Sequence, residues 1–217
     1  MKKLYGIGTG PGDKELLTLK AVRTIENSSV IFAPNNKGKN MAIDTAKDFI
    51  GDKKIVFIDL PMGHVLKEDY EKAAEIIFQE ITEGEIGSFL TIGDPMIYST
   101  FIYVMEELEG KDIDIEIISG IPSFVAAAGE SMTPLTVKGE SFLLCDELEE
   151  ELPEKIDSIC ILKTFNGKEK ILSILSNNDY SYRYIKRATS EEQEIMIDKE
   201  EILKDKDYMS LIIARKN

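Results

Sequence analysis

Residues 3–34 read KLYGIGTGPGDKELLTLKAVRTIENSSVIFAP, and they set the pattern for the first half of the chain. The apolar run KLYGIGT predicts a β-strand, DKELLTLKAVRTIEN predicts a helix, and SVIFAP predicts a second strand. Strands separated by helices at this spacing are typical of βαβ units around a mostly parallel sheet. This stretch therefore indicates an α/β fold.

The same alternation continues to about residue 118. The predicted helices are MAIDTAKDFI, EDYEKAAEIIFQEITEG and PMIYSTFIYVMEELEG, and the predicted strands are KIVFIDL, IGSFLTIGD and DIDIEIISG. The runs VIFA and IGSFLTI are almost wholly apolar, as expected of strands that are covered on both faces. We predict a first domain over residues 1–116 with a mostly parallel sheet.

The rhythm changes after residue 120. A short helix, IPSFVAAAG, is followed by the strand-like ESFLLCD and SICILKTF, the helical KEKILSILSNN, and the strand-like YRYIKRAT, EQEIMID and YMSLIIAR. More strand and fewer helices indicate a second, mixed α/β domain over residues 117–217. Because no low-complexity linker separates the two domains, we expect them to pack closely.

Composition excludes several classes of function. The chain has 217 residues and a net charge of −14, which disfavours nucleic acid, since phosphate binding depends on clustered Lys and Arg. No apolar run approaches the roughly 20 residues of a membrane span, and the N-terminal residues lack a signal-peptide core. Cys145 and Cys160 lie in apolar segments, as buried reduced thiols do. We expect a cytoplasmic protein with no membrane partner.

The glycines from Gly6 to Gly12 resemble a dinucleotide-binding loop, but the spacing argues against one. The G-x-G-x-x-G fingerprint would place its third glycine at Pro11 or Asp13. Proline donates no N–H, and a carboxylate at the helix N-cap satisfies the free amides and repels a phosphate. This disfavours a dinucleotide-dependent oxidoreductase. A cationic ligand that carries adenosine, such as S-adenosylmethionine (SAM), suits this loop better.

A second glycine turn lies in TIGDPMIYST, residues 91–100. It follows an apolar strand, so Gly93 and Asp94 should lie at the carboxyl edge of the sheet, where open α/β sheets bind ligands. Two interpretations of Asp94 stay open. Its carboxylate offers a partner to a cation, hydroxyl or amine, or it caps a helix that begins at Pro95.

With GIGTGPGDKELLTLKA, TIGDPMIYST and GIPSFVAAAG in this order, the chain resembles the tetrapyrrole (class III) methyltransferases over essentially its whole length. GDPMIYST makes it most similar to the branch that methylates C20 of precorrin-2 or cobalt-factor II in cobalamin biosynthesis. The resemblance implies a two-domain homodimer that binds SAM in a cleft between the domains. It also implies methyl transfer to the C20 meso carbon.

The resemblance also implies which residues contact SAM. They are Pro11, Gly93, Asp94, Ile97, Tyr98, Ser99, Thr100, Pro122, Ser123, Lys163, Thr164, Ala188, Ile213 and Ala214. It identifies no catalytic base. Tyr98 and Asp94 are the nearest candidates, and both are better explained as binding groups.

The implied substrate carries eight carboxylates, and the chain is itself acidic, so local bases must supply recognition. The candidates are Lys37 and Lys39 in NNKGKN, and Arg183, Lys186 and Arg187 in YRYIKRAT; of the second group, Arg183 is the predicted substrate contact. The alternative for the NNKGKN lysines is an ordinary solvated loop. Charge reversal at Lys37 and Lys39 should raise the KM for the tetrapyrrole and leave SAM affinity intact.

Three other functions stay open. One is a related methylase that acts on uroporphyrinogen III or a later precorrin, although the uroporphyrinogen branch differs after GDP and after GI. Another is a module that binds SAM without turnover. The third, the dinucleotide-dependent oxidoreductase, is weakened by Pro11 and Asp13.

We predict no metal site, because a single histidine, His64, is not a ligand set. The resemblance slightly favours the cobalt-containing substrate over the metal-free one.

Overall fold

The computed structural model describes residues 1–35, 40–60 and 66–217. The chain divides into two compact units, Met1–Pro122 (unit 1) and Ser123–Asn217 (unit 2). The sequence placed the boundary at residues 116 and 117, which lie inside the last strand of unit 1.

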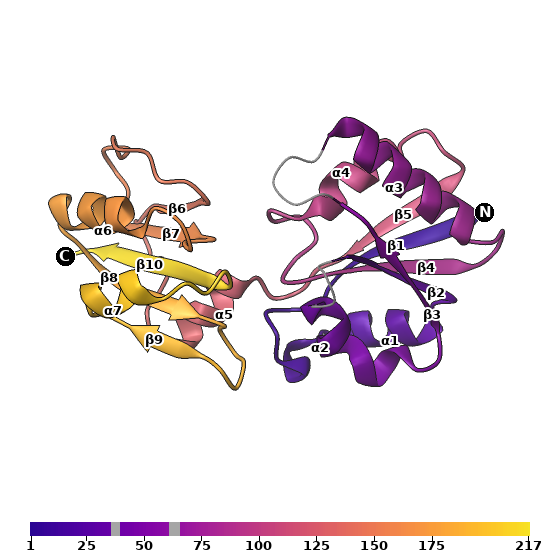
Figure 1. The fold of residues 1–217 in the computed structure, drawn as a ribbon, viewed down its shortest axis with the longest axis horizontal. Helices are drawn as coiled ribbons and strands as arrows, with labels where there is room; N and C mark the ends of the chain where they lie inside the picture. The colour runs from indigo at the N-terminus through magenta and orange to yellow at the C-terminus, as the bar shows by residue number, and fades with distance from the viewer. Residues whose placement is uncertain (36–39, 61–65) are drawn as a thin grey trace. The chain divides into compact units, whose positions relative to one another are not determined.

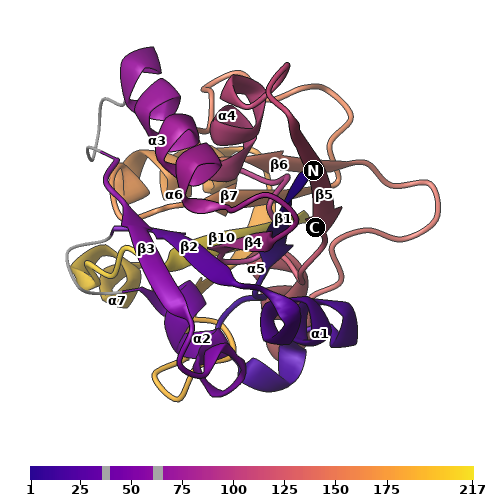
Figure 2. The ribbon, with the colours of Figure 1, turned by 90° about the vertical axis from the view of Figure 1, so that its right-hand side faces the viewer.

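Unit 1 is a parallel sheet between two layers of helices (Figures 1 and 2). Its five strands lie in the order β3-β2-β4-β1-β5, and every neighbouring pair is parallel. The strands are β1 (Lys2–Gly8), β2 (Val30–Pro34), β3 (Lys54–Ile58), β4 (Ile86–Thr91) and β5 (Ile113–Ile118). The helices are η1 (Lys14–Leu16), α1 (Leu19–Asn27), α2 (Met41–Ile50), α3 (Lys67–Glu80) and α4 (Thr100–Glu107). The predicted parallel α/β sheet is confirmed.

The helices cover the two faces of this sheet in pairs. On one face α3 and α4 enclose Leu4, Phe32 and Phe89, and on the other α1 and α2 enclose Ile31 and Leu90. Consecutive residues of β2 and β4 thus point into different cores, which explains why these strands are apolar throughout.

The connections make β1 and β4 the switch point of the sheet. The chain leaves β1 through α1 toward the β3 edge, and it leaves the adjacent β4 through α4 toward the β5 edge. Loops that depart in opposite directions from neighbouring strands open a crevice at the carboxyl edge, where sheets of this kind bind ligands.

Unit 2 is built on a mixed sheet of five strands in the order β6-β7-β10-β8-β9. β6 and β7 are parallel and the other neighbouring pairs are antiparallel, which confirms the predicted mixed sheet. The strands are β6 (Phe142–Cys145), β7 (Ser158–Leu162), β8 (Tyr180–Lys186), β9 (Glu194–Met196) and β10 (Ser210–Lys216). The helices are α5 (Ser123–Glu130), α6 (Lys168–Asn177) and α7 (Lys199–Lys204).

The sheet of unit 2 separates two cores. Leu211 and Ile213 of β10 pack with α5 on one face, whereas Ile212 and Ala214 pack with α6 and α7 on the other. The two cysteines are also divided in this way: Cys145 packs in the second core and Cys160 in the first. Both are free thiols; Cys160 is buried as predicted, whereas Cys145 is only partly buried.

Two helices begin later than predicted. The segment expected to form one helix from Asp13 is divided into η1 and α1, because the Thr18 hydroxyl accepts a hydrogen bond from the Ala21 amide and starts a new helix there. The helix expected from Pro95 begins at Thr100 instead, after a turn. In the part of the chain that the structure describes, no helix has the length and apolar character to cross a bilayer.

Candidate functional site

Two loops meet at the switch point of unit 1. The Gly10 amide donates to the Gly93 carbonyl at 3.3 Å, and the Gly93 amide donates back to Gly10 at 2.8 Å. The Thr9 amide and hydroxyl both donate to the Thr91 carbonyl, at 2.8 and 3.1 Å. The GTGPGD loop after β1 and the GDP loop after β4 therefore form one backbone platform.

Glycines allow a third loop, after β5, to join this platform. A Cβ atom at Gly8 would lie 2.3 Å from the Gly93 carbonyl oxygen, and one at Gly120 would lie 2.1 Å from the same atom. Neither distance is compatible with a side chain, because the neighbours are backbone. The glycines thus let the three loops approach each other more closely than other residues permit.

Asp94 fastens the loops together. One carboxylate oxygen accepts a hydrogen bond from the Met96 amide at 2.8 Å, and the other accepts from the Gly120 amide at 3.2 Å. The residue is 8% exposed. The helix-cap interpretation is wrong, because α4 is capped by Ser99. The Asp94 carboxylate instead accepts from backbone amides of two loops, and its contact with a ligand stays a prediction.

The charge of these three loops disfavours a pyrophosphate as their ligand. Residues 9–13, 92–99 and 119–122 contain two carboxylates and no Lys or Arg. Asp13 caps η1 by accepting a hydrogen bond from the Glu15 amide at 2.8 Å, as predicted. Pro11 beside it is buried and donates no N–H. An anion would meet carboxylates here, whereas a sulfonium would be stabilised by their charge.

Ile97, Tyr98, Ser99 and Thr100 follow the platform and lead into α4. Ser99 is the N-cap: its hydroxyl accepts from the Phe101 amide and also pairs with the Thr91 hydroxyl at 3.1 Å. Tyr98 has a φ of 47°, a left-handed conformation that is unusual for a side chain of this size, and the residue is 45% exposed.

Two of the predicted contact loops lie in unit 2. Lys163 follows β7 with a φ of 55°, and Ala188 follows β8 between Arg187 and Thr189, whose φ values are 47° and 70°. Lys163 is exposed and Ala188 is 8% exposed. Strained backbone is often found at binding sites. Thr164 is 1% exposed, and its hydroxyl pairs with that of Ser210 at 3.0 Å.

The other predicted residues lie in different places. Pro122 ends unit 1 and Ser123 is the first residue of α5, both half-buried. Ile213 and Ala214 are fully buried inside β10, which is paired with β7 on one side and with β8 on the other, so neither residue is accessible to a ligand in this structure. Lys37, Lys39 and His64 lie outside the described residues.

Arg183 lies within β8, opposite Ile213. Its Nε donates to the Thr133 hydroxyl at 2.8 Å, and the residue lines a surface groove with Met132 and Tyr182. It is four residues, or about 13 Å of strand, from Arg187. The structure therefore does not bring Arg183 to the same loop as Ala188.

The sequence analysis assigned no role at the site to Asp205–Ser210, the segment that leads from α7 into the first residue of β10. It contacts both predicted cofactor loops of unit 2, through Ser210 to Thr164 and through Asp207 to Arg187. Among residues 1–35, 40–60 and 66–217, no three His, Cys, Asp or Glu residues are grouped to hold a metal ion.

The model of the Tetrapyrrole (Corrin/Porphyrin) Methylases matches residues 3–203. The chain belongs to the tetrapyrrole methylases. It is 38% identical to a probable cobalt-precorrin-2 C(20)-methyltransferase from Methanocaldococcus jannaschii, over 100% of this chain and 97% of that protein. It is 27% identical to a cobalt-precorrin-2 C(20)-methyltransferase from Salmonella typhimurium, over 80% of this chain and 78% of that one.

Solved structures show that the methylase shares its fold with other proteins at low sequence identity. A putative cobalamin synthesis related protein from Corynebacterium diphtheriae aligns with a TM-score of 0.78 and 18% identity, over 100% of this chain and 99% of that chain. A uroporphyrin-III C-methyltransferase from Thermus thermophilus, complexed with S-adenosylhomocysteine, aligns with a TM-score of 0.72 and 19% identity, over 98% and 97% of the chains. The fold class expected from the sequence is therefore confirmed.

Proposed function

We propose that this methylase transfers a methyl group from SAM to C20 of a reduced tetrapyrrole at the level of precorrin-2. The observation that carries the proposal is the 38% identity, over the whole chain, to a probable cobalt-precorrin-2 C(20)-methyltransferase. A second relative named for the same reaction supports it. Because both names specify the cobalt substrate, we propose the cobalt-containing tetrapyrrole as the preferred acceptor.

SAM would supply an electrophilic methyl group on its sulfonium. The three-loop platform of unit 1 supports this choice, because it presents backbone groups and two carboxylates without a base. The predicted contacts Pro11, Gly93 and Asp94 belong to this platform, and the Ile97–Thr100 segment follows it. A homodimer in the cytoplasm stays a prediction from the family resemblance.

The chain's contribution to such a reaction would be alignment. A meso carbon conjugated with pyrrole nitrogens is itself nucleophilic, so the protein must hold donor and acceptor in line and exclude water, an effect worth about 7–11 kcal/mol. The hydrogen bonds of Asp94 to two loops make the platform rigid before a ligand binds. Preorganisation of this kind lowers the entropic cost of binding.

An anaerobic turnover assay with SAM tests the proposal. Metal-free precorrin-2, cobalt-precorrin-2, cobalt-factor II and uroporphyrinogen III would be offered separately, with the product followed by mass and by NMR at C20. A gain of one methyl group with loss of the C20 meso proton is expected, fastest with a cobalt substrate. Methylation of uroporphyrinogen III alone would show a different acceptor. Binding of S-adenosylhomocysteine without turnover on any of them would contradict the proposed reaction.

A further inference from the structure

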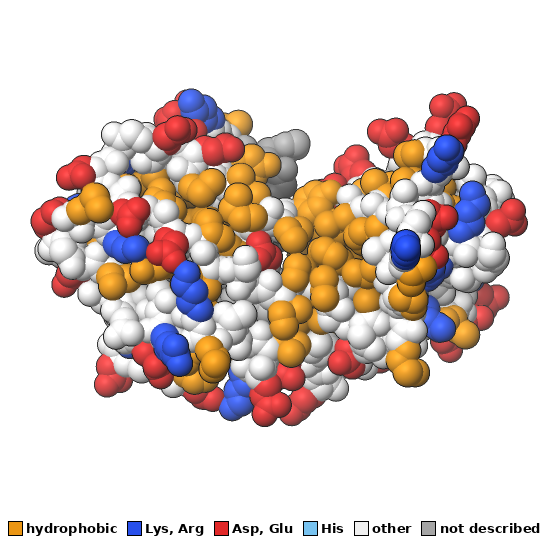
Figure 3. All heavy atoms as spheres, turned by 180° about the vertical axis from the view of Figure 1, so that it is seen from behind, with side chains coloured by type: hydrophobic (Ala, Val, Ile, Leu, Met, Phe, Trp, Pro, Cys, Tyr) orange, Lys and Arg blue, Asp and Glu red, His pale blue; other side chains and the backbone are white. Residues whose placement is uncertain are grey.

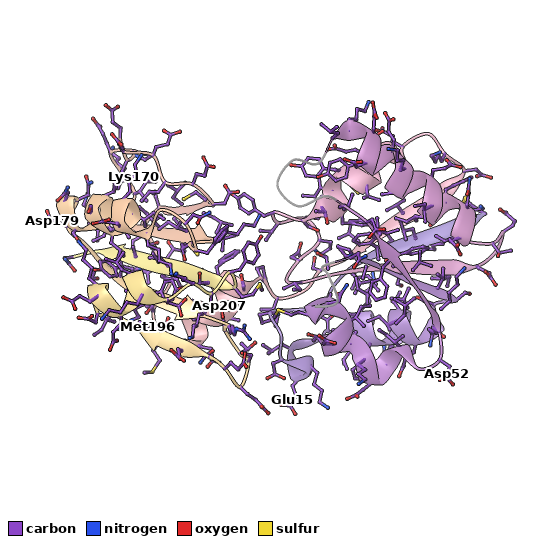
Figure 4. The ribbon with its side chains drawn as sticks, viewed as in Figure 1. Glu15, Asp52, Lys170, Asp179, Met196 and Asp207 are labelled. Carbon is purple, nitrogen blue, oxygen red and sulfur yellow. The ribbon has the colours of Figure 1, made fainter. Side chains whose placement is uncertain are left out.

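We propose that the segment Asp205–Ser210, DKDYMS, is a strut that sets the positions of the two cofactor loops of unit 2, and that Asp207 is its positioning residue. The inference rests on the proposed function, because it takes the loops 163–166 and 187–190 as SAM-binding elements. The relevant contacts are all within unit 2, and Figure 4 labels Asp207 in the loop before β10.

The strut contacts the 187–190 loop through Asp207. One carboxylate oxygen of Asp207 accepts from Arg187 Nε at 2.5 Å, and the other accepts from the Met209 amide at 2.9 Å. The Arg187 amide in turn donates to the Met209 carbonyl at 2.8 Å. Arg187 is held at both its backbone and its side chain, directly before Ala188. These bonds stabilise the left-handed φ of 47° that Arg187 adopts.

The strut contacts the 163–166 loop at its other end. The Thr164 amide donates to the Ser210 carbonyl at 3.4 Å, and the two hydroxyls are 3.0 Å apart. The rings of Phe165 and Tyr208 lie with their centroids 4.9 Å apart. The Ser210 hydroxyl also lies 3.0 Å from the Asp207 carbonyl oxygen. One short segment therefore touches both loops and links them.

A buried ionic cluster anchors the base of the strut. The Asp205 carboxylate accepts from the Tyr184 hydroxyl at 2.7 Å and from the Asp207 amide at 2.8 Å, and it pairs with Lys186 at 3.2 Å. Lys168, only 5% exposed, donates to the Asp205 carbonyl at 2.5 Å. A charge this deeply buried is retained only with several partners. The cluster fixes the strut to β8 and α6.

The test is calorimetric titration of S-adenosylhomocysteine into the full-length chain, well below its unfolding temperature. Asp207→Ala should weaken binding about tenfold. Asp207→Asn, which keeps an acceptor for the Met209 amide, should weaken it less. Arg187→Ala should weaken binding at least as much as Asp207→Ala, because Arg187 also pairs with Glu192. The effects of the two changes should be less than additive in the double variant, because Arg187 and Asp207 share one contact.

Asp198→Ala is the matched control. Asp198 also accepts two backbone amides, at 2.9 and 3.0 Å, but it caps α7 and contacts neither loop. Its replacement should lower the Tm without changing the affinity for S-adenosylhomocysteine. A merely structural role for Asp207 would give the same pattern as this control.

The outcomes separate the two proposals. Unchanged affinity in Asp207→Ala, with the parent chain binding normally, would overturn the strut alone. Weaker binding in the variant, with no methyl transfer by the parent to any tetrapyrrole, would support the strut and overturn the proposed reaction. A parent chain that bound no S-adenosylhomocysteine would overturn both.

Discussion

At the scale of single residues, Asp94 joins two loops at the carboxyl edge of the unit 1 sheet. Its two oxygens serve amides from two loops, and the residue is 8% exposed. In Asp94→Asn, the amide nitrogen must replace one oxygen and face a donor. We expect a loss of about 1–3 kcal/mol in the free energy of unfolding, measured by urea titration, with weaker binding of S-adenosylhomocysteine.

Asp13→Asn is the control for this change. Asp13 accepts the Glu15 amide at the N-cap of η1, and Asn caps a helix as well as Asp does. Its stability should therefore change little. If the two variants were equally stable, the loop-fastening role of Asp94 would be wrong.

The absence of a side chain at Gly8 allows the loops of the same platform to approach each other closely. A Cβ atom there would lie 2.3 Å from the Gly93 oxygen and 2.6 Å from the Gly120 nitrogen, both of which are backbone. Gly8→Ala must separate the loops, so we expect a loss of about 3 kcal/mol in unfolding free energy and of ligand binding. In Gly129→Ala, where the added Cβ meets open space on α5, stability should rise by about 0.5–1 kcal/mol. A Gly8→Ala chain as stable as the parent would contradict the close approach.

At the scale of elements, the strands were more predictable than the starts of the helices. Apolar runs that fill both faces of a buried strand are explicit in the sequence, whereas a helix start depends on which polar residue becomes the cap. The dipeptide Asp94-Pro95 is typical of a helix start, yet Asp94 is engaged by Gly120, a residue distant in the sequence, and Ser99 caps α4 instead. Tertiary contacts of this kind have no local signal.

The strut could not be predicted from the sequence for the same reason. The family motifs include the loops at Lys163 and Ala188, but nothing in DKDYMS marks it as the segment between them. Its role comes from the pairing of β10 with β7 and β8, which places Ser210 opposite Lys186 and beside the end of β7. Sequence motifs indicate which residues face a ligand, and the topology determines which residues hold them.

The burial of Cys145 in β6 and of Cys160 in β7 predicts how fast the two thiols are alkylated. Burial raises the pKa of Cys145 to about 11 from an ordinary value of 9.0, and burial raises the pKa of Cys160 further. Only the thiolate is alkylated, so at pH 8 Cys145 should react with iodoacetamide about 100-fold more slowly than an unperturbed thiol. Its rate should increase up to about pH 11. Mass spectrometry would check this, with the chain in urea as the control in which both thiols react quickly; a fast reaction of the folded chain at pH 8 would contradict it.

At the scale of the whole molecule, charge is the feature that most constrains the proposed reaction. The net charge is −14, and on the face shown in Figure 3 the acidic side chains are spread over both units. A substrate with several carboxylates therefore approaches against repulsion, which salt screens beyond about 10 Å at 0.1 M. We expect the predicted substrate contacts Lys37, Lys39 and Arg183 to offset this repulsion only at short range.

Long-range repulsion opposed by local attraction predicts that the kcat/KM for the tetrapyrrole rises with salt. Raising KCl from 20 to 300 mM should increase kcat/KM for the tetrapyrrole about 3-fold, because screening weakens the long-range repulsion more than it weakens short-range ion pairs. The same assay at saturating tetrapyrrole provides the control: kcat/KM for SAM, whose net charge is positive, should fall or stay constant. A fall in kcat/KM for the tetrapyrrole with added salt would show that the local bases dominate the approach. In that case Arg183→Glu would test whether the substrate carboxylates bind in the groove that Arg183 lines. The variant should lose the fall in kcat/KM with added salt only if the carboxylates contact Arg183.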